Sequence, residues 1–229
     1  MWPRKAKMMT ITSAITRQKR AIVLLPSGGQ LDLLDPSPTS WTNADLATGL
    51  ARTYRWGGHS SWGCPLSVAQ HSLTVLAIRE MLAGPLAPDL ALYELLHDAE
   101  EGLLGFDCIA PLKPFLGAPF ALLSQNLTAA IAYRYDLPNL NEDLWRLHKH
   151  ADRVAAASEA YHVVKWSPGD IRTTLELEEQ PLDTDPLFEP GYEAWEPWPG
   201  DVAAVRWLEA VDLHRDRRRM ERKYAGDNQ

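Results

Sequence analysis

The feature that most constrains the fold of this chain is a helical pattern with a histidine on its inward face. The segment CPLSVAQHSLTVLAIREM (64–81) and the residue after it place four side chains at spacings of four, three and four: His71, Val75, Ile78 and Leu82. Residues at these spacings share one helix face, and the apolar members indicate that this face is buried. A single inward histidine is usually a hydrogen-bonded core residue, so the rest of the chain must decide whether His71 has another role.

The start of this helix is also marked in the sequence. Ser67 can cap the first turn through its hydroxyl, and the Gln70 side chain, three residues later, can reach back to the backbone N–H of the cap. We therefore predict an S-x-x-Q capping box at the start of this helix.

The composition favours a soluble protein of the cytoplasm. Of 229 residues, 45% are hydrophobic, which suffices for the core of one domain with extensions. We expect no membrane helix, because no stretch approaches a run of about 20 apolar residues, and the basic N-terminus lacks the apolar block of a signal peptide. Cys64 and Cys108 cannot form a disulfide framework or a structural zinc site, so we expect reduced thiols.

Charge is distributed unevenly behind the net value of −7. The first 20 residues carry six Lys or Arg and no acid, and residues 206–223 carry seven Lys or Arg. Four acidic residues interleave with these C-terminal arginines: Glu209, Asp212, Asp216 and Glu221. This pattern favours a solvated helix with intrahelical ion pairs over a helix that binds nucleic acid.

The hydrophobic patterns predict an all-α helical array with a short hairpin or extended lead-in at residues 21–40. Helices are expected over 42–55, from 67 onward, and over about 89–101, 120–136, 142–165 and 201–223, with loops at 55–63 and 105–119. The expected division is a basic N-terminal extension (1–20), a helical domain (21–166), and a C-terminal arm with a basic helix (167–229).

The segment DLALYELLHDAEEG (89–102) places a second histidine, His97, on an apparently inward face. Leu90, Tyr93 and Glu101 share that face at helical spacing, and Asp98 follows His97 directly. A buried carboxylate without a partner protonates or costs several kcal/mol. A divalent metal would compensate, because neutral imidazole and ionised carboxylate are both good ligands.

The segment HKHADRVAAASEAYHVV (148–164) offers a fourth ligand. Asp152 and Glu159 lie seven residues apart on one helix, with small alanines between them that allow close packing. His71, His97, Asp98 and Asp152 together would supply two nitrogens and at least two oxygens and leave open positions on the metal. Open positions are typical of a catalytic site rather than a structural one.

These motifs resemble the HD-domain metal-dependent phosphohydrolases, whose pattern H…HD…D is matched by the four residues above, in order. Four segments are similar to a small single-domain subgroup that includes bacterial 5'-deoxynucleotidases and phage nucleotide hydrolases: SVAQHS (67–72), LLHDAEEGLLG (95–105), PLK (111–113) and HADR (150–153). RTYRWGGHS (52–60) also resembles this subgroup, which places an arginine and an aromatic residue ahead of the first metal histidine. The resemblance covers about residues 26–165 and implies the HD-domain fold.

The resemblance implies a role for each matching residue. The H…HD…D residues would hold a divalent transition metal, with Mn, Co, Zn or Fe as candidates. Glu101 would position or deprotonate the attacking water. Arg55 would contact phosphate or sugar, and Trp56 would stack on the nucleoside or bound its pocket.

Three further contacts with the substrate are implied. Lys113 would offer a charge to phosphate, and His59 is a further phosphate contact. The Gly-Asp pair of the family appears here as Gly105-Phe106-Asp107, so Asp107 is the candidate for sugar recognition across an apparent one-residue insertion.

The implied function is metal-dependent hydrolysis of (deoxy)nucleotide phosphate esters. The substrate is either a 5'-dNMP, releasing phosphate, or a dNTP such as dATP, releasing triphosphate. The implied partner is this small-molecule nucleotide, with a homo-oligomer as a family-level expectation. The alternatives are a nucleotide-binding or sensing module without turnover, and nucleic-acid binding through the basic C-terminal helix.

Overall fold

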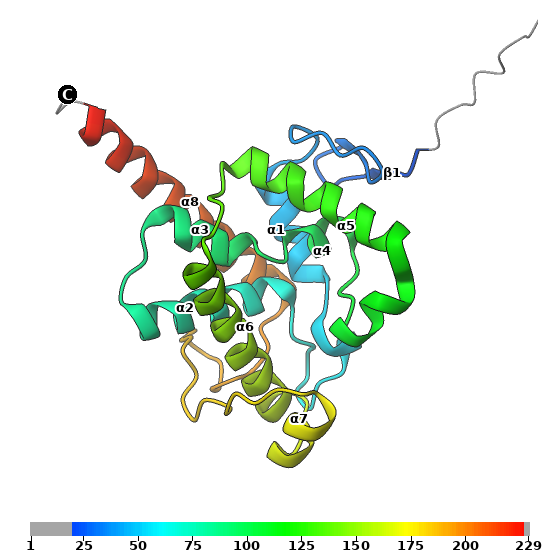
Figure 1. The fold of residues 1–229 in the computed structure, drawn as a ribbon, viewed down its shortest axis with the longest axis vertical. Coiled ribbons are helices and arrows are strands. Elements are labelled where there is room, and N and C mark those ends of the chain that lie inside the picture. The colour runs from blue at the N-terminus through cyan, green and yellow to red at the C-terminus, as the bar shows by residue number, and fades with distance from the viewer. Residues whose placement is uncertain (1–19, 227–229) are drawn as a thin grey trace, which may run out of the picture.

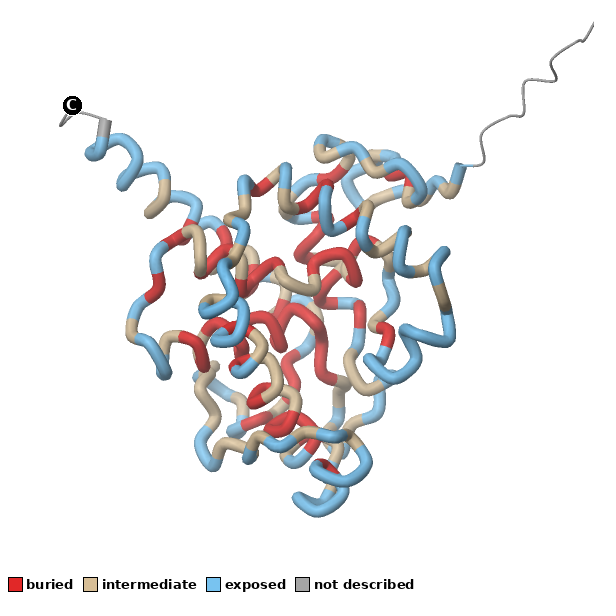
Figure 2. Tube along the Cα trace, viewed as in Figure 1, coloured by how far each residue is buried: buried red, intermediate tan, exposed pale blue. Residues whose placement is uncertain are grey.

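A computed structural model describes residues 20–226, so the basic N-terminal extension lies, apart from Arg20, outside the described residues. The described part is mostly helical around one short hairpin, as predicted (Figure 1). Its elements in chain order are β1 (Ile22–Leu24), β2 (Gln30–Asp32), α1 (Asn43–Arg52), the 3-10 turn η1 (Arg55–Gly58), α2 (Val68–Ala83), α3 (Pro88–Leu96), α4 (Ala99–Leu104), the 3-10 turn η2 (Ala110–Leu112), α5 (Lys113–Tyr135), α6 (Glu142–His162), α7 (Pro168–Thr174) and α8 (Gly200–Gly226). Buried residues concentrate in the middle of the molecule, where α1, α2, α3 and α8 meet (Figure 2).

The predicted hairpin is confirmed and is fixed to α1 by one carboxylate. β1 and β2 pair antiparallel. Thr42 caps α1 in a reciprocal capping box with Asp45. The Asp45 carboxylate also accepts hydrogen bonds from the backbone and the hydroxyl of Ser27, at 2.8 and 2.7 Å. The hairpin loop and the first turn of α1 are therefore held together at one buried side chain.

α1 and α4 pack with their backbones in contact. A Cβ atom on Gly49 would lie 2.2 Å from the carbonyl oxygen of Gly102, and a Cβ on Gly102 would lie 2.8 Å from the backbone nitrogen of Leu50. These two positions therefore require glycine. Because Glu101 precedes Gly102, the close approach also fixes where this acid lies.

The single helix predicted over 89–101 is wrong, because the chain breaks at His97 and Asp98 between α3 and α4. In an uninterrupted helix the carbonyl of Glu94 would accept the Asp98 N–H. Here that carbonyl accepts a hydrogen bond from His97 Nδ1 at 2.7 Å. The side chain thus competes with the helix ladder, and α4 starts afresh with Asp98 at its N-cap position.

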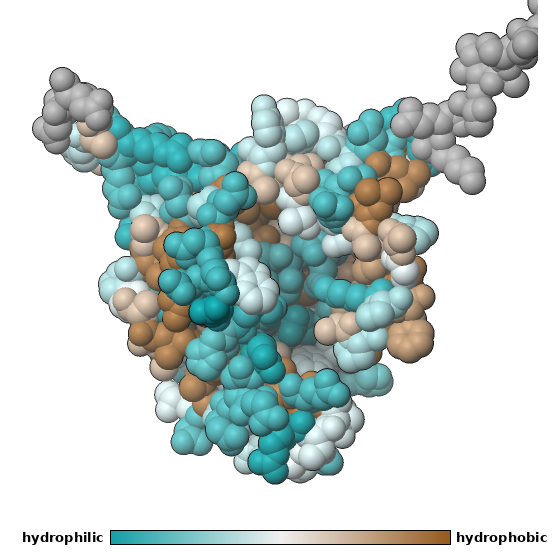
Figure 3. Space-filling model, viewed as in Figure 1, coloured by the Kyte–Doolittle hydropathy of each residue, from teal (hydrophilic) through white to brown (hydrophobic). Residues whose placement is uncertain are grey.

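α5 begins earlier than predicted. It starts at Lys113, with Pro114 in the first turn where proline is tolerated, and it is broken at Gly117 (φ 72°). The predicted loop over 105–119 is therefore wrong from residue 110 onward. Phe115 and Leu122 are exposed, and apolar surface lies along the outer side of α5 (Figure 3).

Residues Ala110–Tyr135, which include α5, are long and apolar enough to cross a membrane by length and composition. This corrects the prediction that no stretch has that character. One such helix is weak evidence for a membrane protein, and this one is interrupted by the break at Gly117. The described chain packs its helices around a buried core, as soluble proteins do.

The start of α2 differs from the prediction in one contact. Ser67 accepts the Gln70 N–H as predicted. The Gln70 side chain does not reach back to the cap but holds the C-terminal arm, donating to the Glu196 carbonyl at 3.1 Å and accepting from the Trp198 N–H at 2.7 Å. The capping box is therefore incomplete, and Gln70 ties the turn before His71 to residues more than 120 positions later.

The inward face predicted for α2 is buried at His71, Val75 and Ile78 but not at Leu82, which is 53% exposed. Leu82 lies in the last turn of α2, where the helix lines a shallow groove of about 250 Å³ rather than the core.

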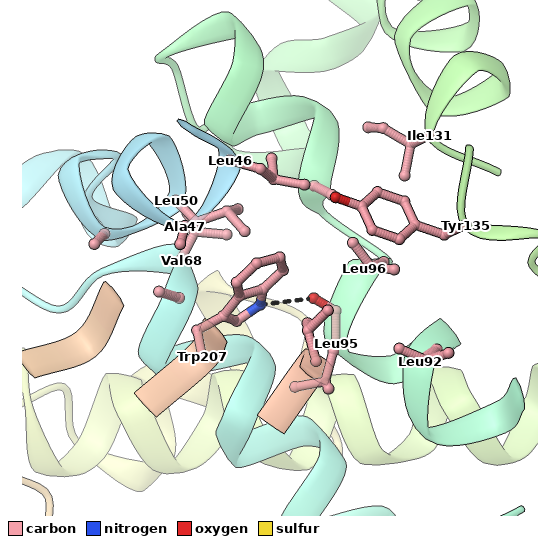
Figure 4. Close-up of a cluster of buried hydrophobic side chains, with 14 of the residues drawn as sticks. Leu46, Ala47, Leu50, Val68, Leu92, Leu95, Leu96, Ile131, Tyr135 and Trp207 are labelled. Atoms are coloured by element: carbon pink, nitrogen blue, oxygen red, sulfur yellow. Dashed lines mark hydrogen bonds between the residues drawn. The ribbon is translucent and has the colours of Figure 1, made fainter. Parts of the chain in front are cut away.

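The C-terminal helix α8 is confirmed, and its first half belongs to the core. Trp207 is fully buried, and its Nε1 donates to the Leu95 carbonyl of α3 at 3.0 Å (Figure 4). The later turns extend away from the body (Figure 1). Their predicted intrahelical ion pairs include Arg215–Asp212 and Arg219–Asp216.

Candidate metal centre

Three of the four predicted metal ligands converge on one point. One ligand atom from each of His71, His97 and Asp152 lies within 4.8 Å of the other two. α2 supplies His71, the break after α3 supplies His97, and α6 supplies Asp152. Together with Asp98, which lies beside them, these residues form what we call the metal cluster.

Both imidazoles are oriented by a hydrogen bond on the nitrogen that points away from the cluster. His71 Nδ1 lies 2.6 Å from Glu159 Oε1, and His97 Nδ1 lies 2.7 Å from the Glu94 carbonyl oxygen. Both partners are acceptors, so each Nδ1 carries a proton and donates it. The two Nε2 atoms therefore face the cluster, 3.3 Å from each other.

The two carboxylates face these Nε2 atoms. Asp98 Oδ2 lies 3.2 Å from His97 Nε2 and 3.6 Å from His71 Nε2, and Asp152 Oδ1 lies 3.4 Å from His71 Nε2. Burial opposes ionisation of both aspartates, but the neighbouring histidines outweigh it and hold both pKa values well below the ordinary range. Lys149, one turn earlier on α6, also pairs with Asp152.

The histidines show the reciprocal effect. Burial opposes protonation of His97, but Asp98 and then Asp152 outweigh it and raise its pKa to about 10. The pKa of His71 is also raised, against burial and the Arg55 charge, by Glu159 and Asp152. Without a metal, protons on these rings therefore supply the positive charge that the carboxylates require.

The residues present fit a divalent cation. Two imidazole nitrogens and two carboxylates are a donor set that suits first-row transition metals. Each histidine has the supporting hydrogen bond on its second nitrogen that metal-binding histidines usually have. The centre thus has the donors that a divalent metal needs, and a bound metal would replace the ring protons as the source of positive charge.

Arg55 and Trp56, predicted to contact the substrate, lie against the metal cluster and share one partner. Arg55 Nε donates to Glu159 Oε2 at 2.8 Å, and Trp56 Nε1 donates to the same oxygen at 3.2 Å. Arg55 Nη1 also lies 3.7 Å from Asp98 Oδ2. Burial opposes the Arg55 charge, but Glu159 and the aspartates outweigh it and raise the arginine pKa further.

Glu101 and Lys113 lie on the side of the centre formed by α4 and α5. Lys113 Nζ is 3.8 Å from Glu101 Oε1, and Glu101 Oε2 is buried without a hydrogen-bond partner among the described residues. Burial raises the pKa of Glu101 to about 9, and the Asp98 and Asp107 carboxylates add to the effect. A proton near neutral pH can therefore reside on this carboxyl.

The remaining two predicted residues, Asp107 and His59, differ in how close they lie to the metal cluster. Asp107 is close enough to interact with Arg55 and Asp98; burial and Asp98 raise its pKa, while Arg55 opposes them. The His59 side chain is exposed, and among the described residues no polar contact links it to the metal cluster. The structure thus brings Asp107 to the site and leaves His59 at its edge.

The sequence did not reveal two residues that matter here. Glu159 was noted only for its spacing from Asp152, yet it is the partner of His71, Arg55 and Trp56. His148 is buried, and its Nδ1 donates to Glu94 Oε2 at 2.6 Å. The only signal for either was its position on the same face of α6 as Asp152, at i+7 and i−4.

Comparison with known proteins gives one informative relative. No family model matches the chain. An uncharacterized protein of Rhodobacter capsulatus is 39% identical over 153 residues, which cover 66% of this chain and 78% of the relative. The chain belongs to the same family as this Rhodobacter capsulatus protein.

Proposed function

We propose that this chain is a metal-dependent phosphohydrolase of the HD-domain type that acts on nucleotides, deoxynucleotides above all. The observation that carries the proposal is the convergence of His71, His97 and Asp152, with Asp98 beside them and each imidazole oriented by a second hydrogen bond. The order of these ligands along the chain is the H…HD…D pattern.

The residues around the metal cluster suit phosphoester hydrolysis. A divalent cation held by the cluster would screen the phosphate charge and make a bound water acidic. The Glu101 carboxyl, with a raised pKa and one unpaired oxygen, suits proton transfer to or from the reacting oxygen atoms. Arg55, 3.7 Å from Asp98, and Lys113, 3.8 Å from Glu101, would supply positive charge to a bound phosphate.

An open surface groove of about 480 Å³ runs along α5 beside Lys113, and its lining includes an aromatic ring and three polar side chains: Phe120, Ser124, Gln125 and Thr128. This groove is the candidate space for a nucleoside. Trp56, which is bonded to Glu159, and Asp107, which interacts with Arg55 and Asp98, are the further candidates for sugar and base contacts. Either a 5'-monophosphate or a triphosphate is compatible with this arrangement.

The test is turnover by purified protein supplied with Mn²⁺, Co²⁺, Fe²⁺ or Zn²⁺. It is offered dNMPs, NMPs and dNTPs, and released phosphate and triphosphate are measured separately. We expect one product with at least one metal, and a loss of at least about 1,000-fold in the Asp98→Ala variant. Undiminished activity in that variant, or no turnover of any nucleotide with every metal, would refute the proposal; nucleotide binding without turnover would identify a sensing module.

A further inference from the structure

Glu159 contacts residues from two parts of the site at once. Its Oε1 accepts from His71 Nδ1 at 2.6 Å, and its Oε2 accepts from Arg55 Nε at 2.8 Å and Trp56 Nε1 at 3.2 Å. The residue is 1% exposed, so bulk water cannot replace any of these partners. One carboxylate on α6 thus joins a residue of the metal cluster to the turn that follows α1.

The turn held by Glu159 is conformationally unfavourable. Trp56 has φ 58° and ψ 27°, and Gly57 and Gly58 follow at φ 62° and 79°. Glycine adopts the left-handed region readily, but a tryptophan there needs support from its surroundings. On one side the Arg55 N–H donates to the Leu66 carbonyl at 2.9 Å, and on the other the Trp56 indole is bonded to Glu159.

We propose that Glu159 is a positioning residue that orients the His71 ring and the Arg55–Trp56 turn as one unit. Metal affinity and the placement of the phosphate-binding arginine then depend on the same carboxylate. The inference rests on the metal centre of the proposed function, and it adds a residue that the H…HD…D pattern does not contain.

The chemistry of the three contacts indicates a specific variant. All three partners of Glu159 are donors, and a carboxylate accepts from all of them. In Glu159→Gln the amide keeps the size of the side chain but has one acceptor oxygen, and its NH₂ group must face either His71 or the Arg55–Trp56 pair. Facing His71, it would favour an imidazole with its proton on Nε2, the nitrogen that faces the metal cluster.

The experiment compares wild-type protein, Glu159→Gln and Glu159→Asp in two measurements that do not depend on turnover. The first is Co²⁺ affinity, followed by the visible absorption of the bound ion. The second is the indole N–H resonance of Trp56 in the metal-free protein, assigned with Trp56→Phe. In Glu159→Gln the result depends on which way the amide turns. If its NH₂ group faces His71, we expect Co²⁺ affinity to fall about tenfold to a hundredfold. If it faces the Arg55–Trp56 pair, we expect the Trp56 resonance to move toward that of a solvent-exposed indole.

Glu159→Asp keeps the charge but shortens the side chain, so it should fold even if Glu159→Gln does not. It should show a smaller fall in Co²⁺ affinity and a smaller shift of the Trp56 resonance. The matched control is Asp45→Asn, another buried carboxylate that accepts hydrogen bonds but lies in the first turn of α1, and it should leave Co²⁺ affinity within about threefold and the Trp56 resonance in place. Unchanged Co²⁺ affinity together with an unchanged Trp56 resonance in folded Glu159→Gln, or either one unchanged in Glu159→Asp, would overturn the joint role. Absence of Co²⁺, Zn²⁺ or Mn²⁺ binding by wild-type protein would instead overturn the proposed function, and the Trp56 resonance would still decide whether Glu159 holds the turn.

Discussion

Two buried polar clusters lie side by side on the same helices and differ in how their charges are balanced. Next to the metal cluster, Arg79 of α2, Glu94 of α3 and His148 of α6 form what we call the Arg79 cluster. The two clusters touch, because the His97 and His148 rings are 5.0 Å apart and the Glu94 carbonyl orients His97.

The Arg79 cluster satisfies its own carboxylate. Glu94 Oε1 accepts from Arg79 Nε at 2.8 Å, and Oε2 accepts from His148 Nδ1 at 2.6 Å. The metal cluster instead directs two carboxylates and two Nε2 atoms at one another, and added positive charge must balance them. Burial and polarity are common to both clusters, so the unbalanced charge, and not burial, distinguishes the candidate metal site.

The largest effect on stability is expected from a substitution in the Arg79 cluster. Arg79→Ala would leave Glu94 buried without its cationic partner and should lower the free energy of unfolding by about 3–5 kcal/mol. Urea denaturation measures this loss. Co²⁺ affinity of the folded variant should change by less than about threefold, and a loss of stability below about 1 kcal/mol would show that the pair is not structural.

Metal binding should stabilise the protein through the metal cluster and not through the Arg79 cluster. At a free metal concentration 100 times the dissociation constant, the free energy of unfolding should rise by about 2.7 kcal/mol. Asp152→Asn should abolish most of this increment, whereas Arg79→Ala should retain it despite its lower starting stability. Thermal melting with and without Zn²⁺ or Co²⁺ measures this increment in wild-type protein, Asp152→Asn and Arg79→Ala. An equal increment in all three proteins would contradict the assignment of the metal to the metal cluster.

The metal cluster should also respond to pH. The pKa of His97 is raised from 6.5 to about 10, so its proton stabilises the metal-free fold fully below about pH 6.5, and this contribution is lost as pH rises through 10. A metal must displace that proton, so Co²⁺ affinity should increase with pH and proton release should accompany binding. Calorimetry in buffers of different ionisation enthalpy measures the protons released, and an affinity independent of pH between about 6 and 8 would be inconsistent with this exchange.

A buried carboxylate outside both clusters, Asp45, should have the smallest effect on stability and serves as a reference for both clusters. Asp45 is held by hydrogen bonds from Ser27 and Thr42 without a charged partner, and against the effect of burial these bonds lower its pKa. Its contribution to stability is therefore present above the ordinary pKa of 3.8 and is lost as pH falls through the lower folded value. Asp45→Asn should cost about 1 kcal/mol at neutral pH in urea denaturation and less at about pH 3, without effect on metal binding; a cost that does not decrease on acidification would argue against this linkage.

Much of the fold could be predicted from local patterns, and the errors have local causes. Hydrophobic spacing and caps predicted the hairpin, α1, α2, α6 and α8. The break at His97 escaped prediction because a side chain takes the place of a backbone donor, which spacing does not reveal. The early start of α5 escaped because its prolines, which normally indicate a loop, occupy a first turn and a position just after a break.

The candidate site also contains some residues that local sequence patterns could predict and others that they could not. His71 and Asp152 were predictable from the small and apolar residues that share their helix faces. His97 and Asp98 lie at the break between α3 and α4, so the H…HD…D resemblance, and not helical spacing, is what identified them. The role of Glu159 was not, because its contacts with Arg55 and Trp56 join residues more than 100 positions apart. The partners of Gln70 escaped prediction for the same reason.

The contacts of Gln70 and Trp207 have a consequence for synthesis of the chain. The turn before His71 is tied to Glu196 and Trp198, and α3 is covered by Trp207 of α8. A ribosome releases residues 196–207 long after α2 and α3, so these two helices emerge well before the segments that hold them in place. We therefore expect the candidate metal ligands to reach their final arrangement only after residue 207 has emerged, and a metal to be bound only from that point onward.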